Sequence, residues 1–130
     1  MTAILRTPAD WPAILLPRDE PADPLDLDAA RERGAFAGLR RALHDLGATG
    51  TIATVASSGL RGRGGAGFPT AEKWRAAAGA PSSRRYVVAN GYGADPSSQT
   101  DRTLMERNPY AVLEGVVIAA TAIGAGEAIV

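Results

Sequence analysis

The feature that constrains this chain most is a glycine-rich stretch near its middle, residues 57–70. Five glycines and two arginines fall between Gly59 and Gly67. A regular helix or strand rarely carries glycine at this density, because glycine loses more conformational freedom on folding than any other residue. The stretch therefore has to be a loop, in which glycine permits positive φ and leaves backbone N–H groups open to close approach.

The residues of this loop favour the binding of a phosphate. The G-x-G-x-x-G spacing is met by Gly62, Gly64 and Gly67. Arg61 and Arg63 can grip phosphate in a bidentate way, and Phe68 adds a flat apolar face. The loop thus indicates a phosphate cradle for a nucleotide or a flavin. A surface turn without a ligand is the alternative, since this spacing alone is a weak signal.

Composition limits the class of protein. The 130 residues correspond to one domain, with 45% apolar and 22% charged residues. Fourteen basic side chains balance 14 acidic ones, so no overall positive field attracts nucleic acid or an anionic membrane. The sequence has no cysteine, which excludes an iron–sulfur cluster within it. No apolar run is long enough for an anchor, so we expect a cytoplasmic protein without direct membrane insertion.

The chain divides into two parts. Residues 1–26 are expected to form an extended proline-rich lead-in, because five of the nine prolines lie at positions 8, 12, 17, 21 and 24. Its apolar residues are expected to pack this arm onto the chain or a partner: Trp11, Ile14, Leu15 and Leu16. Residues 27–130 form the predicted domain.

Three helices are expected before the glycine loop. Asp26 or Asp28 can cap the first, which ends at Gly34. The second covers residues 35–46, with an apolar stripe at Phe36, Leu39, Leu43 and Leu46 and a surface His44 beside it. Thr49 or Thr51 can cap the third, whose core-facing residues are Ile52 and Val55. A helix before the loop departs from the Rossmann turn, in which a strand precedes the glycines.

A further helix should follow the loop over residues 71–78, capped by Thr70. Its N-terminus would add free N–H groups and a favourable dipole for a phosphate at the loop. Lys73 lies in the first turn, where the helix dipole disfavours a cation. It either has an anionic partner or is a solvated surface lysine.

The last third of the sequence predicts a β–loop–α–β unit. A buried strand is expected over residues 85–90, with Asn90 and Asp95 after its carboxyl end as candidate site residues or as turn formers. Thr100 or Asp101 can cap a helix ending at Arg107. A well-buried helix over residues 110–123 and a strand over 127–130 follow. We expect an α/β fold whose Rossmann-like unit is incomplete, as in a fragment or a split protein.

These motifs resemble one family. The segment SGLRGRGGAGFPT at residues 58–70, followed by Lys73 and Trp74, is similar to the FMN- and NADH-binding flavoprotein subunit of respiratory complex I. The diaphorase subunits of NAD-reducing hydrogenases and formate dehydrogenases carry the same module. Further similar positions are residues 34–36 with residues 39–43, residues 86–90 with Pro96, Asp101, Arg102, residues 104–106, Pro109, Glu114 and Gly115.

The resemblance implies a function and a set of binding residues. It implies that FMN receives hydride from NADH and releases electrons singly to an iron–sulfur chain in other segments or subunits. No catalytic acid or base is implied, because the flavin supplies the chemistry. The implied cofactor-binding residues are Gly62, Arg63, Gly64, Gly65, Gly67, Phe68, Lys73, Asn90 and Asp95. Among these, Phe68 matches the residue on which the adenine of NADH stacks.

The sequence also departs from the family pattern after Asn90. Where the family has two acidic residues, this chain has Tyr92 and Gly93, and the last glutamate of the motif is Asp95. In the family these acids lie at the flavin and nicotinamide sites. The alternative function is therefore a degenerate, non-catalytic paralogue with a structural or nucleotide-binding role.

Overall fold

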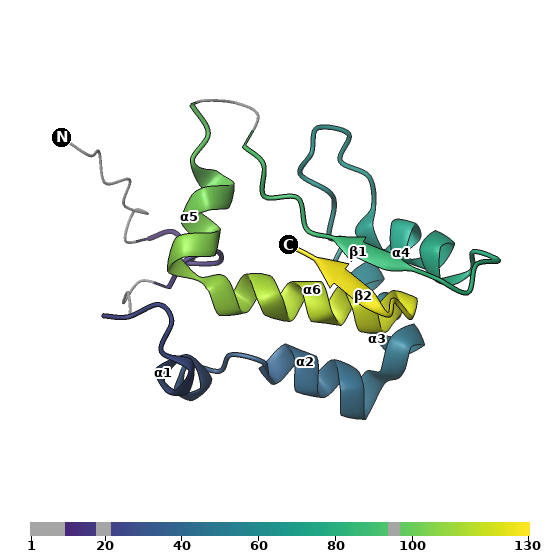
Figure 1. Cartoon of the computed structure of the whole chain (residues 1–130), viewed down its shortest axis with the longest axis horizontal. Coiled ribbons are helices and arrows are strands. Elements are labelled where there is room, and N and C mark those ends of the chain that lie inside the picture. The colour runs from purple at the N-terminus through teal and green to yellow at the C-terminus, as the bar shows by residue number, and fades with distance from the viewer. Residues whose placement is uncertain (1–9, 18–21, 94–96) are drawn as a thin grey trace.

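The fold is an α/β arrangement built around one central helix. The computed structural model describes residues 10–17, 22–93 and 97–130. Figure 1 shows α6 crossing the middle of the molecule, with α1 and α2 along one side and the two strands near its carboxyl end. The elements are α1 (Leu27–Glu32), α2 (Ala37–Arg41), the π-helix η1 (Ala42–Leu46), α3 (Gly47–Ser57), α4 (Thr70–Ala78), β1 (Tyr86–Val88), α5 (Thr100–Arg107), α6 (Pro109–Ile123) and β2 (Glu127–Ile129).

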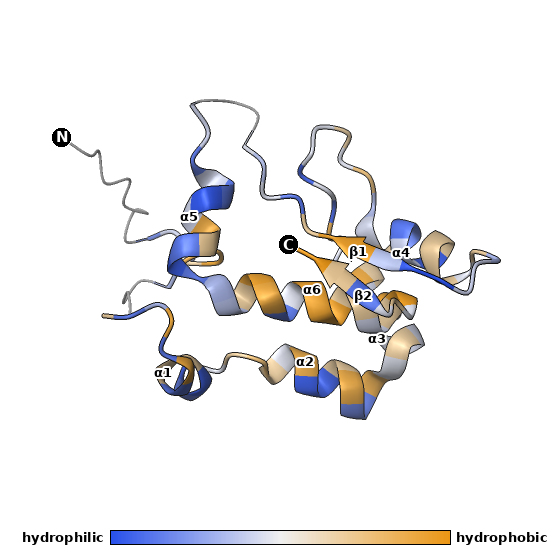
Figure 2. Ribbon diagram, viewed as in Figure 1, coloured by the Kyte–Doolittle hydropathy of each residue, from blue (hydrophilic) through white to orange (hydrophobic). Residues whose placement is uncertain are grey.

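Helix α6 is the element on which the others pack. It begins with Pro109 at its first position and ends at Gly124 in the left-handed conformation, with φ 67°, both as predicted. It contacts α2, α3, α4, α5 and both strands. Orange apolar residues run along it in Figure 2. Its predicted burial is only partly confirmed, because Leu113 and Val117 remain exposed.

The core beneath α6 is made largely of small side chains. Ile52 of α3, Ala71 of α4 and Ala122 of α6 form a buried cluster, and Val55 and Trp74 pack against it. The predicted inward direction of Ile52 and Val55 is thereby confirmed. Within the described residues the other buried apolar side chains are Ala30, Ala42, Val116 and Ile123.

The two strands pair in parallel and confirm the α/β class. Tyr86 pairs with Glu127, Val87 with Ala128, and Val88 with Ile129. The prediction that the first strand is buried is wrong, since Tyr86 is 48% and Val88 66% exposed. Successive residues of a strand point to opposite faces. In the described residues α6 contacts the strands, and the face carrying Tyr86 and Val88 remains open.

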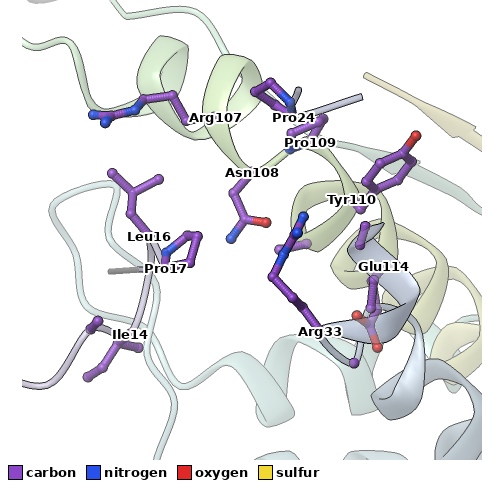
Figure 3. A pocket seen from close by; sticks show the side chains of 15 residues that line it. Ile14, Leu16, Pro17, Pro24, Arg33, Arg107, Asn108, Pro109, Tyr110 and Glu114 are labelled. Atoms are coloured by element: carbon purple, nitrogen blue, oxygen red, sulfur yellow. The ribbon is translucent and has the colours of Figure 1, made fainter. Parts of the chain in front are cut away.

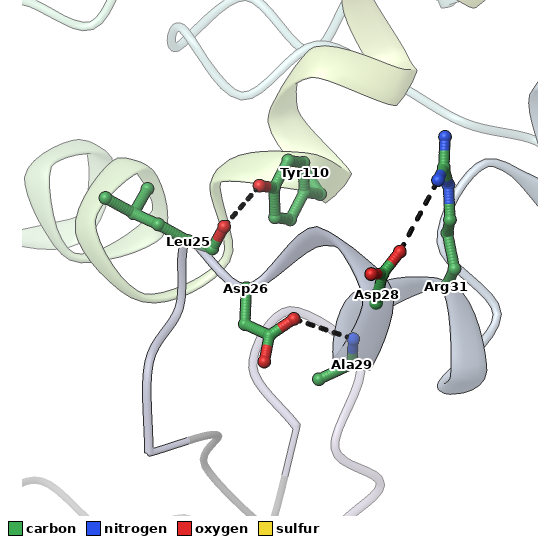
Figure 4. Close-up of polar contacts among 6 residues, drawn as sticks. All are labelled: Leu25, Asp26, Asp28, Ala29, Arg31 and Tyr110. Atoms are coloured by element: carbon green, nitrogen blue, oxygen red, sulfur yellow. Dashed lines mark hydrogen bonds and ion pairs between the residues drawn. The ribbon is translucent and has the colours of Figure 1, made fainter.

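The first helix forms as its sequence predicts. The Asp26 carboxylate accepts a hydrogen bond from the Ala29 N–H at 2.9 Å, so Asp26 is its N-cap (Figure 4). The Tyr110 hydroxyl of α6 donates to the Leu25 carbonyl at 2.6 Å, as the same view shows. This bond holds the start of α1 against α6.

The second predicted helix is divided in two. Helix α2 begins at Ala37, two residues late, because Phe36 adopts a left-handed conformation with φ 64°. The chain then forms the π-helix η1, which no periodicity in the sequence indicated. A wider turn rotates the following side chains off a 3.6-residue stripe, and Leu43 is 51% exposed, contrary to prediction. His44 is exposed, as expected.

Glu114 supplies the cap that α2 lacks in its own sequence. Its carboxylate accepts hydrogen bonds from the Phe36 and Leu39 N–H groups, each at 2.9 Å. Gly38 leaves room for it, since a Cβ there would lie 2.9 Å from Glu114 Oε1. The Phe36 ring packs edge-on against Tyr110 at 5.9 Å between centroids. These contacts offset the cost of a bulky residue at positive φ, about 1–3 kcal/mol.

Three predicted threonine caps are wrong. Helix α3 begins at Gly47, and the Thr51 hydroxyl donates back to the Gly47 carbonyl at 2.7 Å. Thr70 is the first residue of α4, after Pro69, and α5 follows Gln99 without a side-chain cap. A side-chain cap accepts a hydrogen bond from an N–H two or three residues after it, whereas a threonine inside the helix, such as Thr51, can bond back to the carbonyl four residues before it.

The described part of the lead-in attaches by polar contacts. The Asn108 amide donates to the Leu15 carbonyl at 2.9 Å. Trp11, Ile14 and Leu15 are exposed, so the described chain does not bury these three side chains, and their packing onto a partner stays a prediction. Leu16 is half-buried. The acidic part of this arm lies largely outside the described residues.

Removing the Glu114 carboxylate should destabilise the fold. We expect Glu114→Ala to lower the free energy of unfolding by about 2–4 kcal/mol, because two N–H groups lose a charged acceptor. Glu114→Gln keeps one acceptor oxygen and should cost about 1–2 kcal/mol. Urea denaturation measures both. The control is Glu106→Gln in the exposed pair with Arg102, expected within about 0.5 kcal/mol of the parent. Equal effects at positions 106 and 114 would contradict the capping role.

Candidate functional site

The glycine loop is a hairpin that joins α3 to α4. The Gly62 N–H donates to the Phe68 carbonyl at 2.9 Å, and the Thr70 N–H donates to the Leu60 carbonyl at 3.0 Å. The hairpin follows a helix, as predicted, and therefore differs from a Rossmann turn. In Figure 1 it rises from the helices as a teal loop on the same side of α6 as the segment that follows β1.

The two arginines of the loop have different roles. Arg61 Nη1 donates to the Gly67 carbonyl at 2.9 Å and so holds the two arms of the hairpin together. One nitrogen of the Arg61 guanidinium is thus engaged within the loop, and the expectation that Arg61 grips phosphate stays a prediction. Arg63 is exposed and makes no hydrogen bond or ion pair within residues 10–17, 22–93 and 97–130. Its charge is available at the tip.

The tip of the hairpin leaves its backbone open. Gly65 and Gly67 have φ of 105° and 59°, which only glycine adopts readily. An added Cβ at Gly64, Gly65 or Gly67 would meet no atom within 4 Å. Within the described residues the backbone N–H groups of residues 63–68 donate no hydrogen bond. Such a row of open donors beside a cation is suited to an anion.

Lys73 projects from α4 back to the hairpin. Its Nζ lies 5.8 Å from the centroid of the Phe68 ring, which is within cation–π range. The sequence left Lys73 with either an anionic partner or solvation. Among the described residues it forms no ion pair and is exposed, which agrees with a surface lysine, and it also lies over an aromatic face. Gly62, Arg63, Gly64, Gly65, Gly67, Phe68 and Lys73 thus lie together in the hairpin and the first turn of α4.

Asn90 belongs to a segment other than the hairpin and α4. It follows β1 and its Oδ1 accepts a hydrogen bond from the Tyr92 N–H at 2.9 Å, so it forms the turn that was one of its two predicted roles. Tyr92 is 78% exposed. Gly91 packs on α5, where an added Cβ would lie 2.8 Å from Met105 Cε. Asp95 lies outside the described residues.

One cavity of the described chain was not predicted from the sequence. About 320 Å³ in volume, it lies between the lead-in, the end of α1 and the start of α6 (Figure 3). Glu114, Asn108 and Tyr110 line it, and each of them already bonds the protein. A second cavity of about 200 Å³ lies at the base of the hairpin, beside Arg61 and Arg75. Neither cavity includes Arg63, Phe68 or Lys73.

Comparison with known proteins decides the family. The model of the Nuo51 FMN-binding domain matches residues 55–130, which include the whole hairpin, α4 and the β–α–β unit. The chain belongs to the Nuo51 FMN-binding domain family. The resemblance inferred from the hairpin motif is thereby confirmed.

The chain is also similar to subunits of redox enzymes. A subunit of the NADH-quinone oxidoreductase of Escherichia coli is 37% identical over 126 residues, 96% of this chain and 28% of the relative. The corresponding NADH-quinone oxidoreductase subunit of Aquifex aeolicus is 40% identical over 102 residues, 78% of this chain and 24% of the relative. The chain thus spans about a quarter of the curated relatives it matches.

A solved structure supports the same fold. An NAD+-reducing [NiFe]-hydrogenase in its H2-reduced state superposes with a TM-score of 0.66 at 39% identity, covering 72% of this chain and 16% of that one. The likeness supports the α/β arrangement of the Nuo51-type chain described above.

The hydrogen bond from Arg61 to Gly67 should control how firmly the hairpin is closed. We expect Arg61→Ala to raise amide hydrogen exchange at Gly62 and Thr70 by about fivefold to tenfold, because the hairpin loses a charged donor. Arg63→Ala is the matched control and should leave both rates unchanged. Equal rates in the parent and the Arg61 variant would show that the hairpin closes without this bond.

Proposed function

We propose that this chain is part of a flavoprotein that holds FMN at the tip of its glycine hairpin. The observation that carries the proposal is the row of open N–H groups at residues 63–68 beside Arg63 and Lys73. Positive charge and backbone donors are what a phosphate monoester requires. The membership of the family described as an FMN-binding domain supports the same ligand.

The residues present fit this cofactor. Gly62, Gly64, Gly65 and Gly67 let the backbone approach a phosphate without side chains in the way. Arg63 and Lys73 supply the neutralising charge, and the first turn of α4 adds a favourable dipole. Asn90 and Asp95 follow β1 and belong to the proposed site on the strength of the sequence motif.

We further propose that the complete protein oxidises a reduced nicotinamide nucleotide. The bound flavin would supply the chemistry, which is to accept hydride and to release single electrons. The chain's own groups would bind the flavin and orient it. The electrons would pass to iron–sulfur groups in other segments or subunits, since this sequence has no cysteine. Phe68, half-exposed beside the loop, is suited to stack on the adenine of NADH.

The proposed location is the cytoplasm, with the chain peripheral to a larger complex. None of the helices in the described residues has the length and apolar character to cross a bilayer. A relative such as the alpha subunit of the NAD-reducing hydrogenase HoxS of Cupriavidus necator, 48% identical over 79 residues, shows by its name that the module occurs as a subunit. That match covers 61% of this chain and 13% of the relative.

A second function is favoured by one observation. Tyr92 and Gly93 stand where the family pattern has acids, and the Tyr92 ring projects into solvent. A chain that retains the hairpin and lacks these carboxylates can hold a flavin or nucleotide without oxidising NADH. NADH–ferricyanide assay of the complete protein separates the two functions. Turnover supports the redox function, and its absence in flavin-loaded protein supports a structural or nucleotide-binding one.

The cations at the hairpin should determine FMN affinity. We expect Arg63→Ala and Lys73→Ala each to weaken FMN binding by about tenfold to a hundredfold, since each removes a charge-assisted contact to phosphate. Flavin fluorescence titration of the complete protein, with its accompanying subunits, measures the change. Arg75→Ala is the control, because it removes the same charge from a different face of α4 and should change affinity less than twofold. Unchanged affinity in both hairpin variants would contradict the proposed site.

A further inference from the structure

Phe68 and Lys73 form a contact that the proposed function does not require. Stacking of a base needs only the ring, and phosphate binding needs only the ammonium group. The structure instead holds Lys73 Nζ 5.8 Å from the centroid of the Phe68 ring. Among the described residues no carboxylate competes for this ammonium group.

The backbone that carries the ring is held independently of the lysine. Phe68 follows Gly67, which has φ 59°, and its carbonyl accepts the Gly62 N–H at 2.9 Å. Arg61 holds the preceding carbonyl at 2.9 Å. The ring is therefore attached to a backbone of defined conformation and has two side-chain torsions, whereas the lysine side chain has a flexible four-carbon stem. Of the two groups, the ring is the one able to position the other.

Lys73 needs such support where it lies. It occupies the first turn of α4, where the helix dipole repels a cation. A free lysine there would swing into solvent and lose rotamer freedom on binding an anion. The face of an aromatic ring attracts the ammonium and leaves other N–H donors of the group directed elsewhere.

We infer that Phe68 is a positioning residue for Lys73, which holds the ammonium group ready for the phosphate of FMN. This inference rests on the proposed FMN site. It gives one ring two separate uses, one face toward the lysine and the rest of its half-exposed surface toward a nucleotide base. FMN affinity then depends on a ring that does not touch the phosphate.

The test is a double-mutant cycle with FMN and riboflavin, which lacks the phosphate, on the complete protein with its subunits. We expect Phe68→Leu to weaken FMN binding by about twofold to fivefold and to leave riboflavin binding unchanged. In a Lys73→Met background the same change should have no effect on FMN. Phe68→Tyr, which keeps the aromatic face, should retain the affinity of the parent.

The other outcomes overturn the inference. An equal loss of riboflavin affinity, or a loss that persists in the Lys73→Met background, would assign Phe68 to direct flavin contact. Unchanged or tighter FMN binding in Phe68→Leu, while Lys73→Met weakens it, would remove the positioning role and leave the proposed function intact. Absence of FMN binding by the parent protein would overturn both.

A measurement without ligand tests the inference even if the Phe68→Leu variant fails to fold. In the parent protein the ring current of Phe68 should shift the Lys73 ε-methylene NMR signal upfield. The Phe68→Tyr variant should keep this shift. A signal at the position of a solvated lysine in the parent would overturn the inference.

Discussion

The fold depends on Glu114, the residue that lets α6 bind polar groups on one side while its other residues pack apolar ones. The helix must be apolar enough to pack α3, α4 and the strands. It also has to satisfy N–H donors at the start of α2, whose N-cap Phe36 is in the left-handed conformation. One carboxylate placed among apolar residues meets both Phe36 and Leu39. The N-terminal helices are therefore oriented by polar geometry, while the hairpin side is held by burial around Ile52 and Ala122.

Local chemistry made much of this fold predictable. Asp26 caps α1, Gly124 ends α6, and Pro109 starts it, because each signal acts within one turn of its own helix. The Glu114 cap was not predictable, since Glu114 lies 78 positions after Phe36 and 75 positions after Leu39 in the sequence. The π-helix was not predicted either. A 3.6-residue periodicity assumes a uniform helix, and one wide turn is enough to expose Leu43.

In the candidate site, too, some features were predictable from the sequence and others were not. Glycine density and the family motif located the hairpin and Lys73, but the sequence assigned both arginines to a ligand. The structure gives Arg61 to the Gly67 carbonyl and leaves Arg63 at the tip. The Asn90 side-chain oxygen accepts a hydrogen bond from the Tyr92 N–H. Asparagine commonly bonds the backbone N–H two residues after it in turns. The sequence could therefore group the residues of the hairpin, and for Asn90 it offered two roles, of which the turn is the one observed.

The small size of the core side chains determines which substitutions the fold resists. Where four of the buried residues are alanines, from Ala30 to Ala122, backbones approach closely and there is little side-chain volume to remove. Truncation at such positions opens almost no void, but an added methylene has nowhere to go and forces neighbouring helices apart, at about 1–3 kcal/mol. Substitutions at these positions are thus limited to side chains no larger than alanine. A single Ala71→Val change would press α4, and with it Lys73, away from its place beside the hairpin.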